Sequence, residues 1–473
     1  MRVYFIGICG TAMATLAAML KERGYAVSGS DQHVYPPMSD FLAVRGITCH
    51  GGFDAAHITN DIDLVVIGNA VSRGNPEVEA VLDGKLKYRS LPEMVRETFL
   101  WDRYNVVIAG THGKTTTAAL VSWVLTDAGR DPSFLIGGLT GNFDSSYRLG
   151  SGREFVIEGD EYDSAFFDKT AKFLKYLPSL VVVGNVEFDH ADIYVDLDAV
   201  RLAVQRLVSL LPQQGQLLLG ADSEEALDLS ERAPCEVVTF GLAKGADWRA
   251  TNVVFGSGGV QFVVERRGAS VVEVRAPLVG DFNVRNILAA FAVAVGLGLD
   301  YDEISSSIGR FKGVKRRLEV RGRARGVTVY DDFAHHPTAV RETLLGVRAA
   351  FPSRRIWALF EPRSASACRR IFQDEFVGAF GSADEVVIGQ VYRSSLPPRE
   401  RLDEGLLVSG LRESGLRARH IPEVSDIVRA IAEEAREGDL VVVMSNGAFG
   451  GIHARLLAAL GSDLDEVRHQ DLD

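Results

Sequence analysis

The chain has 473 residues, of which 47% are apolar and 24% charged, and its formal net charge at pH 7 is −12. At roughly 150 residues per domain, this length predicts about three domains, and the composition is that of an ordinary globular protein. The negative charge argues against nucleic-acid binding as a main function, because a phosphate backbone requires a basic surface. Nucleotide binding stays open, since a bound nucleotide needs only a few local donors.

The cysteines and the N-terminus indicate the compartment. Cys9, Cys49, Cys235 and Cys368 form no C-x-x-C pair, which indicates neither a zinc site nor a disulfide framework. The apolar run at residues 2–8 has no small-residue cleavage region after it, so we interpret it as a buried strand rather than a signal peptide. No stretch approaches the ~20 apolar residues of a membrane span. We therefore expect a cytoplasmic protein with no membrane partner.

Short apolar, β-branched runs alternate with amphipathic segments along nearly the whole chain. Such runs are typical of strands buried on both faces of parallel sheets, and the alternation predicts an α/β architecture. We expect strands within residues 2–8, 63–70, 105–110, 154–160, 179–185, 355–361, 385–391 and 439–446, and a helix at 198–211.

Two connecting segments divide the chain. One lies near residues 97–105, and the other is the basic segment at 310–320. We therefore expect domains at residues 1–101, 102–315 and 316–473. Residues 236–279 alternate polar and apolar side chains between glycines, which predicts antiparallel hairpins inserted in the middle domain.

The segment AGTHGKTTT at residues 109–117 lies between a predicted strand and a predicted helix. In that position glycines let backbone N–H groups face an anion, and the helix N-terminus adds partial positive charge. Lys114 would reach the β- and γ-phosphates of a nucleotide, and the Thr115 hydroxyl would bind Mg²⁺. The strict P-loop pattern needs glycine where this chain has Ile108, so we interpret the loop as a shorter variant of that site.

The N-terminal glycines give a weaker signal. Residues 7–13, GICGTAM, have GxxG spacing rather than the dinucleotide pattern GxGxxG, which argues against a nicotinamide dehydrogenase. The order is nevertheless strand, glycine turn, helix and second strand. Asp31 ends that second strand about 20 residues on, where an acidic residue can bind a ribose hydroxyl. A nucleotide site and a purely structural βαβ unit both fit this pattern.

Two polar clusters follow predicted strands of the middle domain, EGDEYD at 158–163 and NVEFDHADIY at 185–194. Ligands of doubly wound sheets bind beyond the carboxyl ends of the strands, so we expect both clusters to meet the phosphate loop. Glu158 and His190 are candidate Mg²⁺ ligands, although carboxylates and water are the usual partners of that ion. The acidic residues could instead cap helices.

Three further segments carry candidate polar groups. Asn283 and Asn286 lie on one face at the predicted start of a helix, where each could bind a base or ribose or cap the helix. GVKRRLEV at 313–320 supplies three cations suited to phosphate charge, or simply a solvated charge run. DDFAHHPTAV at 331–340 follows a predicted strand and indicates a ligand-facing loop.

These motifs follow one another in the same order as those of the Mur ligase family. Through them the chain resembles that family over essentially its whole length. The motifs are AGTHGKTTT, EGDEYD, NVEFDH, NVRN (283–286), KRRLE (315–319) and DDFAHHP (331–337). The resemblance implies a three-domain α/β architecture: a Rossmann-like N-terminal domain for a uridine nucleotide, a P-loop-type central ATPase domain, and a Rossmann-like C-terminal domain that brings the amino substrate.

The resemblance also implies the reaction, an ATP-dependent amide ligation in peptidoglycan synthesis and cell-wall recycling. A carboxylate attacks the γ-phosphate of ATP and the resulting acyl phosphate is attacked by an amine. A tetrahedral intermediate then collapses to the amide, so that ADP and phosphate are released. A carboxylate and a triphosphate repel each other, which explains why Lys114, Mg²⁺ and Arg317 would be needed between them.

The segments at 7–17, 28–31 and 68–80 resemble the branch of the family whose first substrate is UDP-N-acetylmuramate. Within it, residues 34–39, 158–169, 361–366 and 444–453 resemble the enzyme that adds the recycled tripeptide L-alanyl-γ-D-glutamyl-meso-diaminopimelate. One alternative is the ligase that adds L-alanine. The alternative of another class is a nucleotide-binding regulatory module that hydrolyses nothing. We expect a monomer or a weak homo-oligomer.

The resemblance carries roles to individual residues. For ATP it implies Gly110, Thr111, His112, Gly113, Lys114, Thr115, Thr116, Asn286, Arg317 and Asp332. For the UDP-sugar it implies Gly10, Thr11, Asp31, Asn69 and Ser72, and for the peptide Arg363 and Asn446. Thr115, Glu158 and His190 would hold Mg²⁺, and the catalytic set would be Lys114, Glu158, His190, Arg317 and His335. Lys169 and Lys172 lie where some members carry a carbamylated lysine, but their spacing does not match.

Overall fold

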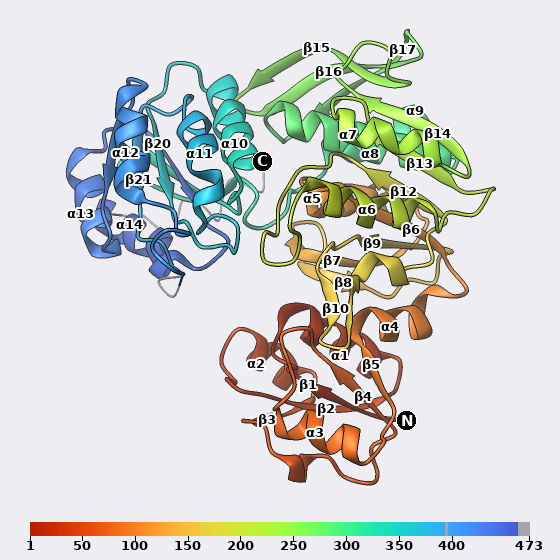
Figure 1. Cartoon of the computed structure of the whole chain (residues 1–473). Coiled ribbons are helices and arrows are strands. Elements are labelled where there is room, and N and C mark those ends of the chain that lie inside the picture. Colours follow the sequence, from red (N-terminus) through yellow and green to blue (C-terminus); the bar gives the residue numbers. More distant parts are fainter. Residues whose placement is uncertain (393–395, 462–473) are drawn as a thin grey trace.

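The computed structural model describes residues 1–392 and 396–461. Three sheets, one after another along the chain, each form the centre of a layered α/β body (Figure 1). The N-terminal body lies below the central body in Figure 1, and the C-terminal body lies beside the central one. The α/β architecture expected from the alternating pattern is therefore confirmed. Within the described residues, no helix combines the length and the apolarity needed to cross a bilayer.

The N-terminal sheet is parallel throughout, in the order β3-β2-β1-β4-β5. Its strands are β1 (Arg2–Ile6), β2 (Ala26–Asp31), β3 (Thr48–Gly51), β4 (Leu64–Ile67) and β5 (Tyr88–Ser90), and its helices are α1 (Thr11–Glu22), α2 (Met38–Val44), α3 (Pro76–Asp83) and α4 (Leu91–Val95). Strand β1 is central because both its faces are apolar: Val3 and Phe5 pack on one side, Tyr4 and Ile6 on the other. The strand order reverses between β1 and β4, and sheets with such a reversal bind ligands beyond the carboxyl ends of the strands at that point.

The central sheet has ten strands in the order β17-β16-β15-β14-β13-β12-β6-β9-β7-β8. They are β6 (Tyr104–Ala109), β7 (Ser133–Thr140), β8 (Ser145–Arg148), β9 (Glu154–Glu158), β12 (Leu180–Val183), β13 (Gln216–Gly220), β14 (Glu236–Gly241), β15 (Trp248–Gly256), β16 (Gly259–Arg266) and β17 (Ala269–Ala276). The helices are α5 (Lys114–Asp127), α6 (Leu197–Val208), α7 (Glu224–Leu227), α8 (Asp281–Gly296) and α9 (Tyr301–Gly309), and a hairpin of β10 (Asp163–Ala165) and β11 (Asp168–Ala171) projects from this body. Strands β12 and β9 flank β6, so their carboxyl ends surround the phosphate loop.

The prediction of antiparallel hairpins for residues 236–279 is right for β15 to β17. It is wrong for β14, which pairs in parallel with both β13 and β15. A helical crossover, formed by α7 and the 3₁₀ turn Asp228–Arg232, connects β13 to β14. It returns the chain to the edge of the sheet at which β13 begins, so that β14 runs in the same direction. The direction of pairing is set by that connection and not by the polar alternation within the strand.

The C-terminal sheet has the order β18-β19-β23-β20-β21-β22, with only the edge pair β18–β19 antiparallel. Its strands are β18 (Glu319–Ala324), β19 (Val327–Asp332), β20 (Ile356–Phe360), β21 (Glu385–Ile388), β22 (Arg417–His420) and β23 (Leu440–Met444). Helices α10 (Pro337–Ala350), α11 (Gln373–Ala379) and α12 (Glu404–Glu413) share one core with the sheet, and α13 (Val424–Glu434) and α14 (Ile452–Leu460) share the other.

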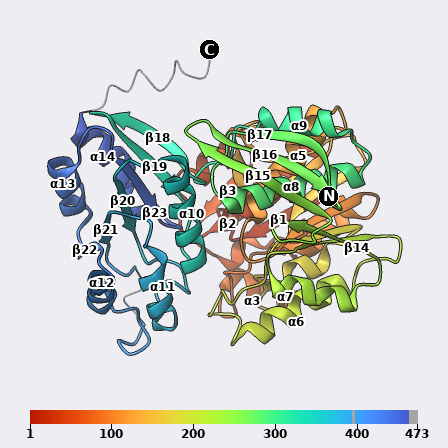
Figure 2. The ribbon, with the colours of Figure 1, turned by 90° about the horizontal axis from the view of Figure 1, so that it is seen from above.

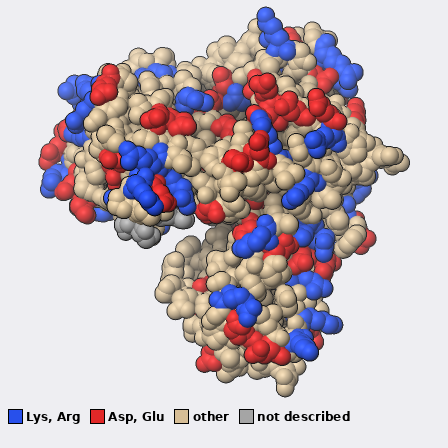
Figure 3. All heavy atoms as spheres, in the orientation of Figure 1, with Lys and Arg blue, Asp and Glu red and all other residues tan. Residues whose placement is uncertain are grey.

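The central and C-terminal bodies touch through polar side chains and through the ring pair of Phe188 and Phe372. Figure 2 shows α10 on the side of the C-terminal body that faces the central body. Thr338 at the start of that helix donates its hydroxyl to Glu187 of the central body at 2.6 Å. Figure 3 shows positive and negative side chains mixed over one face and an open notch between the N-terminal and C-terminal bodies. The polar contact zone therefore lies next to the phosphate loop, where the candidate site is found.

Candidate functional site

The phosphate loop connects β6 to α5 and depends on two glycines. Gly110 and Gly113 have φ angles of 115° and 83°, which L side chains rarely adopt. A Cβ on Gly113 would lie 2.3 Å from Oδ1 of Asn286, and one on Gly110 would lie 2.9 Å from the carbonyl oxygen of Asn185. Gly113 is the N-cap of α5 and supplies no side-chain hydrogen bond. The first N–H groups of α5 are thus left for an anion, as a phosphate cradle requires.

Lys114 begins α5 and forms an ion pair with Glu161. The Nζ atom lies 2.8 Å from the Glu161 carboxylate and donates to the carbonyl oxygens of Gly110 at 2.7 Å and Thr111 at 3.1 Å. Burial lowers the pKa of Lys114, but the carboxylates of Glu161 and Glu158 outweigh it, so that the pKa lies above its ordinary value. Lys114 is therefore a fixed cation at the mouth of the loop.

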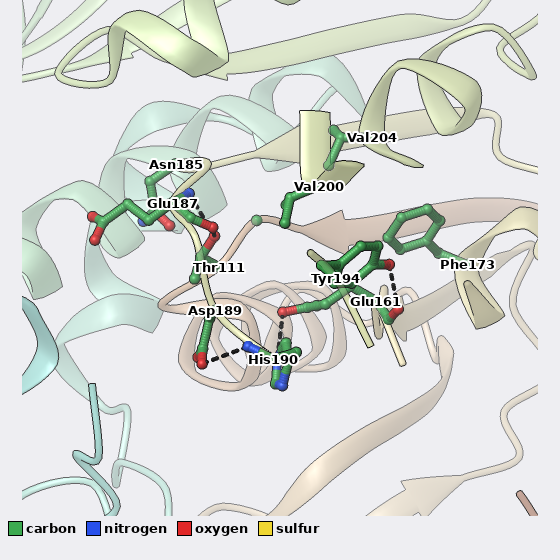
Figure 4. A pocket seen from close by; sticks show the side chains of 11 residues that line it. Thr111, Glu161, Phe173, Asn185, Glu187, Asp189, His190, Tyr194, Val200 and Val204 are labelled. Carbon is green, nitrogen blue, oxygen red and sulfur yellow. Dashed lines mark hydrogen bonds and ion pairs between the residues drawn. The ribbon is translucent and has the colours of Figure 1, made fainter. Parts of the chain in front are cut away.

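Glu161 also contacts His190, which the sequence had paired with Glu158. Figure 4 shows the two side chains pointing toward each other, and Nε2 of His190 lies 2.9 Å from Oε1 of Glu161. Burial lowers the pKa of His190, whereas its bond to Glu161 and the charge of Asp189 raise it above the ordinary value. The hydroxyl of Tyr194 donates to the Glu161 carbonyl oxygen at 2.6 Å. Glu161 thus links Lys114 to His190.

Thr115 and Glu158 lie together at the ends of α5 and β9. The Thr115 hydroxyl donates to Oε1 of Glu158 at 3.0 Å, and the N–H of Gly137 donates to Oε2 at 2.8 Å. Arg317, from the connector before β18, donates from its guanidinium to the Thr115 hydroxyl at 3.2 Å. The hydroxyl and the carboxylate are oxygen donors that fit Mg²⁺. The structure brings Thr115, Glu158 and Arg317 together, while His190 bonds to Glu161 instead.

The two lysines considered for carbamylation are both ion-paired as ammonium groups. Lys172 Nζ lies 2.6 Å from Asp160, and Lys169 Nζ lies 2.5 Å from Asp163. A carbamate would replace each cation by an anion and would set it against these carboxylates. In the structure, the positive charge of each lysine is therefore used in an ion pair.

Asn286 lies against the phosphate loop in the interior of α8. Its Oδ1 accepts from the Thr117 hydroxyl at 3.1 Å, and its Nδ2 donates to Oδ1 of Asn283 at 3.2 Å. Asn283 donates in turn to the carbonyl oxygen of Val279 at 2.9 Å. The N-cap of α8 is Gly280 rather than either asparagine. The two amides form one buried hydrogen-bonded chain that ends at the Thr117 hydroxyl.

Asp332 and His335 lie at the end of β19, facing the central body. Asp332 accepts from the N–H groups of Leu318 and Ala334, each at 2.8 Å, and from the Thr343 hydroxyl at 3.3 Å. These bonds hold the loop that follows β19. His335 Nδ1 lies 2.9 Å from the carbonyl oxygen of Phe333, and its Nε2 lies 3.8 Å from Asp189. Of the two, His335 lies beside the polar cluster that follows β12.

The five residues expected on the UDP-sugar side lie at the carboxyl edge of the N-terminal sheet. Gly10 and Thr11 begin α1 after β1, Asp31 ends β2, and Asn69 and Ser72 follow β4. Four are exposed, and Asp31 is half-buried. Oδ2 of Asp31 accepts from the N–H of Cys9 at 2.9 Å, which ties the carboxylate to the glycine turn. All five therefore lie on the carboxyl edge of the sheet, the side on which such sheets bind ligands.

Arg363 and Asn446 lie at the ends of the adjacent strands β20 and β23. The guanidinium of Arg363 lies 3.6 Å from the ring centroid of Tyr392 and 3.5 Å from Glu361. A Cβ on Gly447 would lie 2.0 Å from Nε of Arg363, so the backbone beside Asn446 supports the arginine directly. Oδ1 of Asn446 is buried without a hydrogen-bond partner. Such an orphaned acceptor is rare in folded proteins and suits a ligand donor.

Three functional-type residues were not singled out from the sequence. Glu161 lies within EGDEYD, and Asn185 and Glu187 lie within NVEFDH, so the motifs pointed to the segments but not to these members. Asn185 accepts from the N–H of His112 at 2.8 Å and shapes the phosphate loop. Thr111 accepts from the N–H of Glu187 at 2.8 Å. These contacts of Asn185 and Glu187 become visible only in the structure, where β6 and β12 are neighbouring strands.

A small pocket beside the phosphate loop has one polar and one apolar wall (Figure 4). Its polar lining includes Thr111, Glu161 and His190, and its apolar lining includes Val200 and Val204 of α6. An apolar wall behind ionised groups strengthens their electrostatic interactions, because it keeps water away. The lining also includes the carboxylates of Glu187 and Asp189, so the polar wall is mainly acidic and suits a bound cation.

The geometry agrees with comparisons to known proteins. Three family models match in chain order: the Mur ligase family catalytic domain at residues 2–100, the Mur ligase middle domain at 108–294 and the Mur ligase glutamate ligase domain at 316–447. A relative from Escherichia coli (strain K12), named UDP-N-acetylmuramate–L-alanyl-γ-D-glutamyl-meso-2,6-diaminoheptandioate ligase, is 40% identical and covers 99% of this chain and 100% of its own length.

Two further comparisons bear on the choice within the family. A relative from Clostridium novyi (strain NT), named UDP-N-acetylmuramate–L-alanine ligase, is 32% identical over 94% of this chain and 95% of its own. The crystal structure of a murein peptide ligase from Psychrobacter arcticus 273-4 superposes with a TM-score of 0.73 at 35% identity, and covers 98% of this chain and 99% of that one. The three-body fold is thus shared over the full length of these proteins.

Proposed function

The chain belongs to the Mur ligase family, and on that premise we propose that it joins the carboxylate of UDP-N-acetylmuramate to the tripeptide L-alanyl-γ-D-glutamyl-meso-diaminopimelate. The reaction consumes ATP and releases ADP and phosphate. The observation that carries the proposal is the 40% identity, over 99% of the chain, to the Escherichia coli ligase with that name. The L-alanine ligase from Clostridium novyi is less similar, at 32%.

The phosphate loop supports the ATP half of the reaction. Gly110 and Gly113 shape the cradle, and Lys114 places a fixed cation at its mouth. Arg317 adds a second cation at Thr115. The carboxylate of the sugar substrate must approach a triphosphate, and these two cations offset the repulsion between them. The roles of these residues toward ATP are part of the proposal.

The proposed metal set is Thr115 and Glu158, which hydrogen-bond to each other, together with His190, which bonds to Glu161. Mg²⁺ bound there supplies Lewis-acid polarisation of the phosphate oxygens. The hydrogen bond from Gly137 orients the Glu158 carboxylate, and Glu161 orients both Lys114 and His190. Asn286 is proposed to meet the adenine, Asp332 to approach the ribose, and His335 to lie near the reacting groups.

The three bodies have proposed tasks and bounds. We assign the UDP-sugar to residues 1–101, ATP to 102–315 and the peptide to 316–473. Gly10, Thr11, Asp31, Asn69 and Ser72 would line the first site, and Arg363 and Asn446 the third. The acyl phosphate must be kept from water, which closure of separate bodies around it provides. The assembly is proposed to be a monomer or a weak homo-oligomer.

The test measures phosphate release from ATP and Mg²⁺ with UDP-N-acetylmuramate and either L-alanine or the tripeptide. Mass spectrometry of the product identifies the amide. We expect release and product with the tripeptide, and neither when Mg²⁺ is chelated nor in the variant Lys114→Ala. Release with L-alanine alone would make the chain the biosynthetic ligase. If no phosphate is released with either amine, the result would favour the nucleotide-binding regulatory module.

A further inference from the structure

A second group of ligand-type side chains lies where the central and C-terminal bodies meet. We call His112, Glu187 and His336 the interdomain triad. One ligand atom from each lies within 4.8 Å of the others. Nε2 of His112 is 3.5 Å, and Nδ1 of His336 is 3.8 Å, from Oε2 of Glu187. At zinc bond lengths of about 2.1 Å, the ligand atoms of a tetrahedral site lie about 3.4 Å apart, so small side-chain movements complete the geometry.

The contacts behind the triad orient its ligand atoms. Nε2 of His336 lies 3.1 Å from the carbonyl oxygen of Phe188, to which it donates, so Nδ1 keeps its lone pair on the side of Glu187. A metal-bound histidine commonly donates its other ring N–H to a backbone carbonyl in this way. The Thr338 N–H points at the same Nδ1 at 3.3 Å, and a bound ion would replace that long bond. The Thr338 hydroxyl holds the Glu187 carboxylate at 2.6 Å.

Two side chains of the triad have shifted pKa values. Burial raises the pKa of Glu187, but the neighbouring His112, the Thr338 hydroxyl and His336 outweigh this and lower it to about 2. Burial lowers the pKa of His336 to about 4. A carboxylate and an imidazole are ligand types that bind divalent transition metals.

One atom of the triad lacks a hydrogen bond. Nε2 of His112 is buried without a hydrogen-bond partner, although the Glu187 carboxylate lies 3.5 Å away. The backbone of His112 is held by its N–H, which donates to Asn185 at 2.8 Å, and its ring lies 4.9 Å from that of His336. A buried ring nitrogen without a partner is costly, and a bound cation would satisfy it.

We propose that the interdomain triad binds a divalent transition metal of the zinc type, with water as the fourth ligand. Two imidazoles and one carboxylate favour Zn²⁺ over Mg²⁺, which prefers oxygen ligands. The site is distinct from the Mg²⁺ set of Thr115, Glu158 and His190. His112 belongs to the phosphate loop and His336 is the N-cap of α10, so the ion ties the central body to the C-terminal one. The inference does not depend on the ligase activity.

The test uses the full chain, freed of metal with a chelator, and Zn²⁺ in competition with a chromophoric chelator. His336→Gln and Glu187→Gln each remove one ligand atom, and His335→Gln is the matched control one residue away. We expect each triad variant to bind Zn²⁺ more than about 10-fold more weakly than the wild type, since even outer-shell partners contribute 10- to 100-fold. The control keeps its affinity. X-ray absorption of the zinc complex should show two imidazole nitrogens at about 2.0–2.1 Å.

Several results would overturn the proposal. One is equal Zn²⁺ affinity in the wild type and both triad variants. Another is a loss of affinity in His190→Gln but not in Glu187→Gln, which would place the ion in the Mg²⁺ set. Absorption spectra without imidazole ligands would exclude the triad as well. His336 caps α10, so circular dichroism checks its variant; if that variant does not fold, Glu187→Gln and His112→Gln decide the matter.

Discussion

The carboxylate of Glu161 lies 2.8 Å from the ammonium of Lys114, which makes Glu161 the direct partner of the phosphate-loop cation. The same carboxylate reaches His190 at 2.9 Å. A buried ammonium with one carboxylate partner keeps its charge and its direction only while that partner remains. Glu161 is thus a positioning residue for two proposed functional side chains.

We expect Glu161→Gln to lower the kcat of ATP-dependent ligation by about 10- to 100-fold, the range for residues that orient the ligands of a site. The KM for the tripeptide should change little, because the peptide is assigned to the C-terminal body. Steady-state kinetics with each substrate varied in turn separate the two effects. Glu161→Asp should recover part of the kcat, which a purely structural role would not produce.

The matched control is Glu225→Gln, which removes the carboxylate that pairs with Arg201 on the central body. It should leave kcat unchanged. An unaltered kcat in Glu161→Gln, with the control also unaltered, would show that Lys114 does not depend on its partner.

Arg363 is expected to bind a carboxylate of the peptide. In Arg363→Ala the KM for the tripeptide should rise by about 10- to 100-fold, which corresponds to one charge-assisted hydrogen bond of roughly 1.5–3 kcal/mol. The KM for UDP-N-acetylmuramate should stay the same, because that substrate is assigned to the N-terminal body. Arg370→Ala, an exposed arginine of the same body, serves as the control. A KM that rises for UDP-N-acetylmuramate instead would reassign Arg363.

Gly447 offers a second way to move Arg363. A Cβ at position 447 would lie 2.0 Å from Nε and 2.2 Å from Cδ of that arginine, so Gly447→Ala must displace the flexible side chain. We expect the tripeptide KM to rise as in Arg363→Ala while the thermal midpoint changes little. Gly378→Ala, where an added Cβ meets no atom within 4 Å, should alter neither quantity. An unchanged KM for the tripeptide in Gly447→Ala would mean that peptide binding does not depend on the position of Arg363.

Asp127 joins the end of α5 to α9 and should make stability depend on pH. Burial raises its pKa, but the Ser307 hydroxyl, at 2.6 Å, and Arg310 outweigh burial and lower the pKa. A carboxyl whose pKa is lower in the folded state stabilises fully above its unfolded pKa of about 3.9, and this contribution is lost as the pH falls through the folded pKa. Asp127→Asn should therefore cost about 1 kcal/mol near pH 7.

Urea unfolding at pH 7 and at a series of acidic values measures that difference. The gap between wild type and Asp127→Asn should narrow as the pH falls below about 4. If the difference in unfolding free energy between the two proteins stays constant down to pH 3, the charge of Asp127 does not contribute to stability. Only the geometry of its hydrogen bonds would then contribute.

Much of the fold was accessible from local pattern. The run at residues 154–160 became β9, and the alternation of such runs with helices established three α/β bodies. Strand β14 shows the limit, because its parallel pairing depends on the crossover before it. The phosphate loop was recognised from GTHGKT because backbone conformation and helix start are local properties, and Gly110 and Gly113 have the positive φ angles that such a loop needs.

The amino-acid order thus settled the family, the sheet class and the segments that carry the chemistry, since each of these depends on residues close together in the chain. The tertiary structure decided which members of those segments touch. Glu161 rather than Glu158 partners His190, and His112 meets His336 from 224 positions away only because the phosphate loop faces the start of α10. Such pairings depend on how whole bodies pack, and that packing is a sum over many distant contacts that no short motif contains.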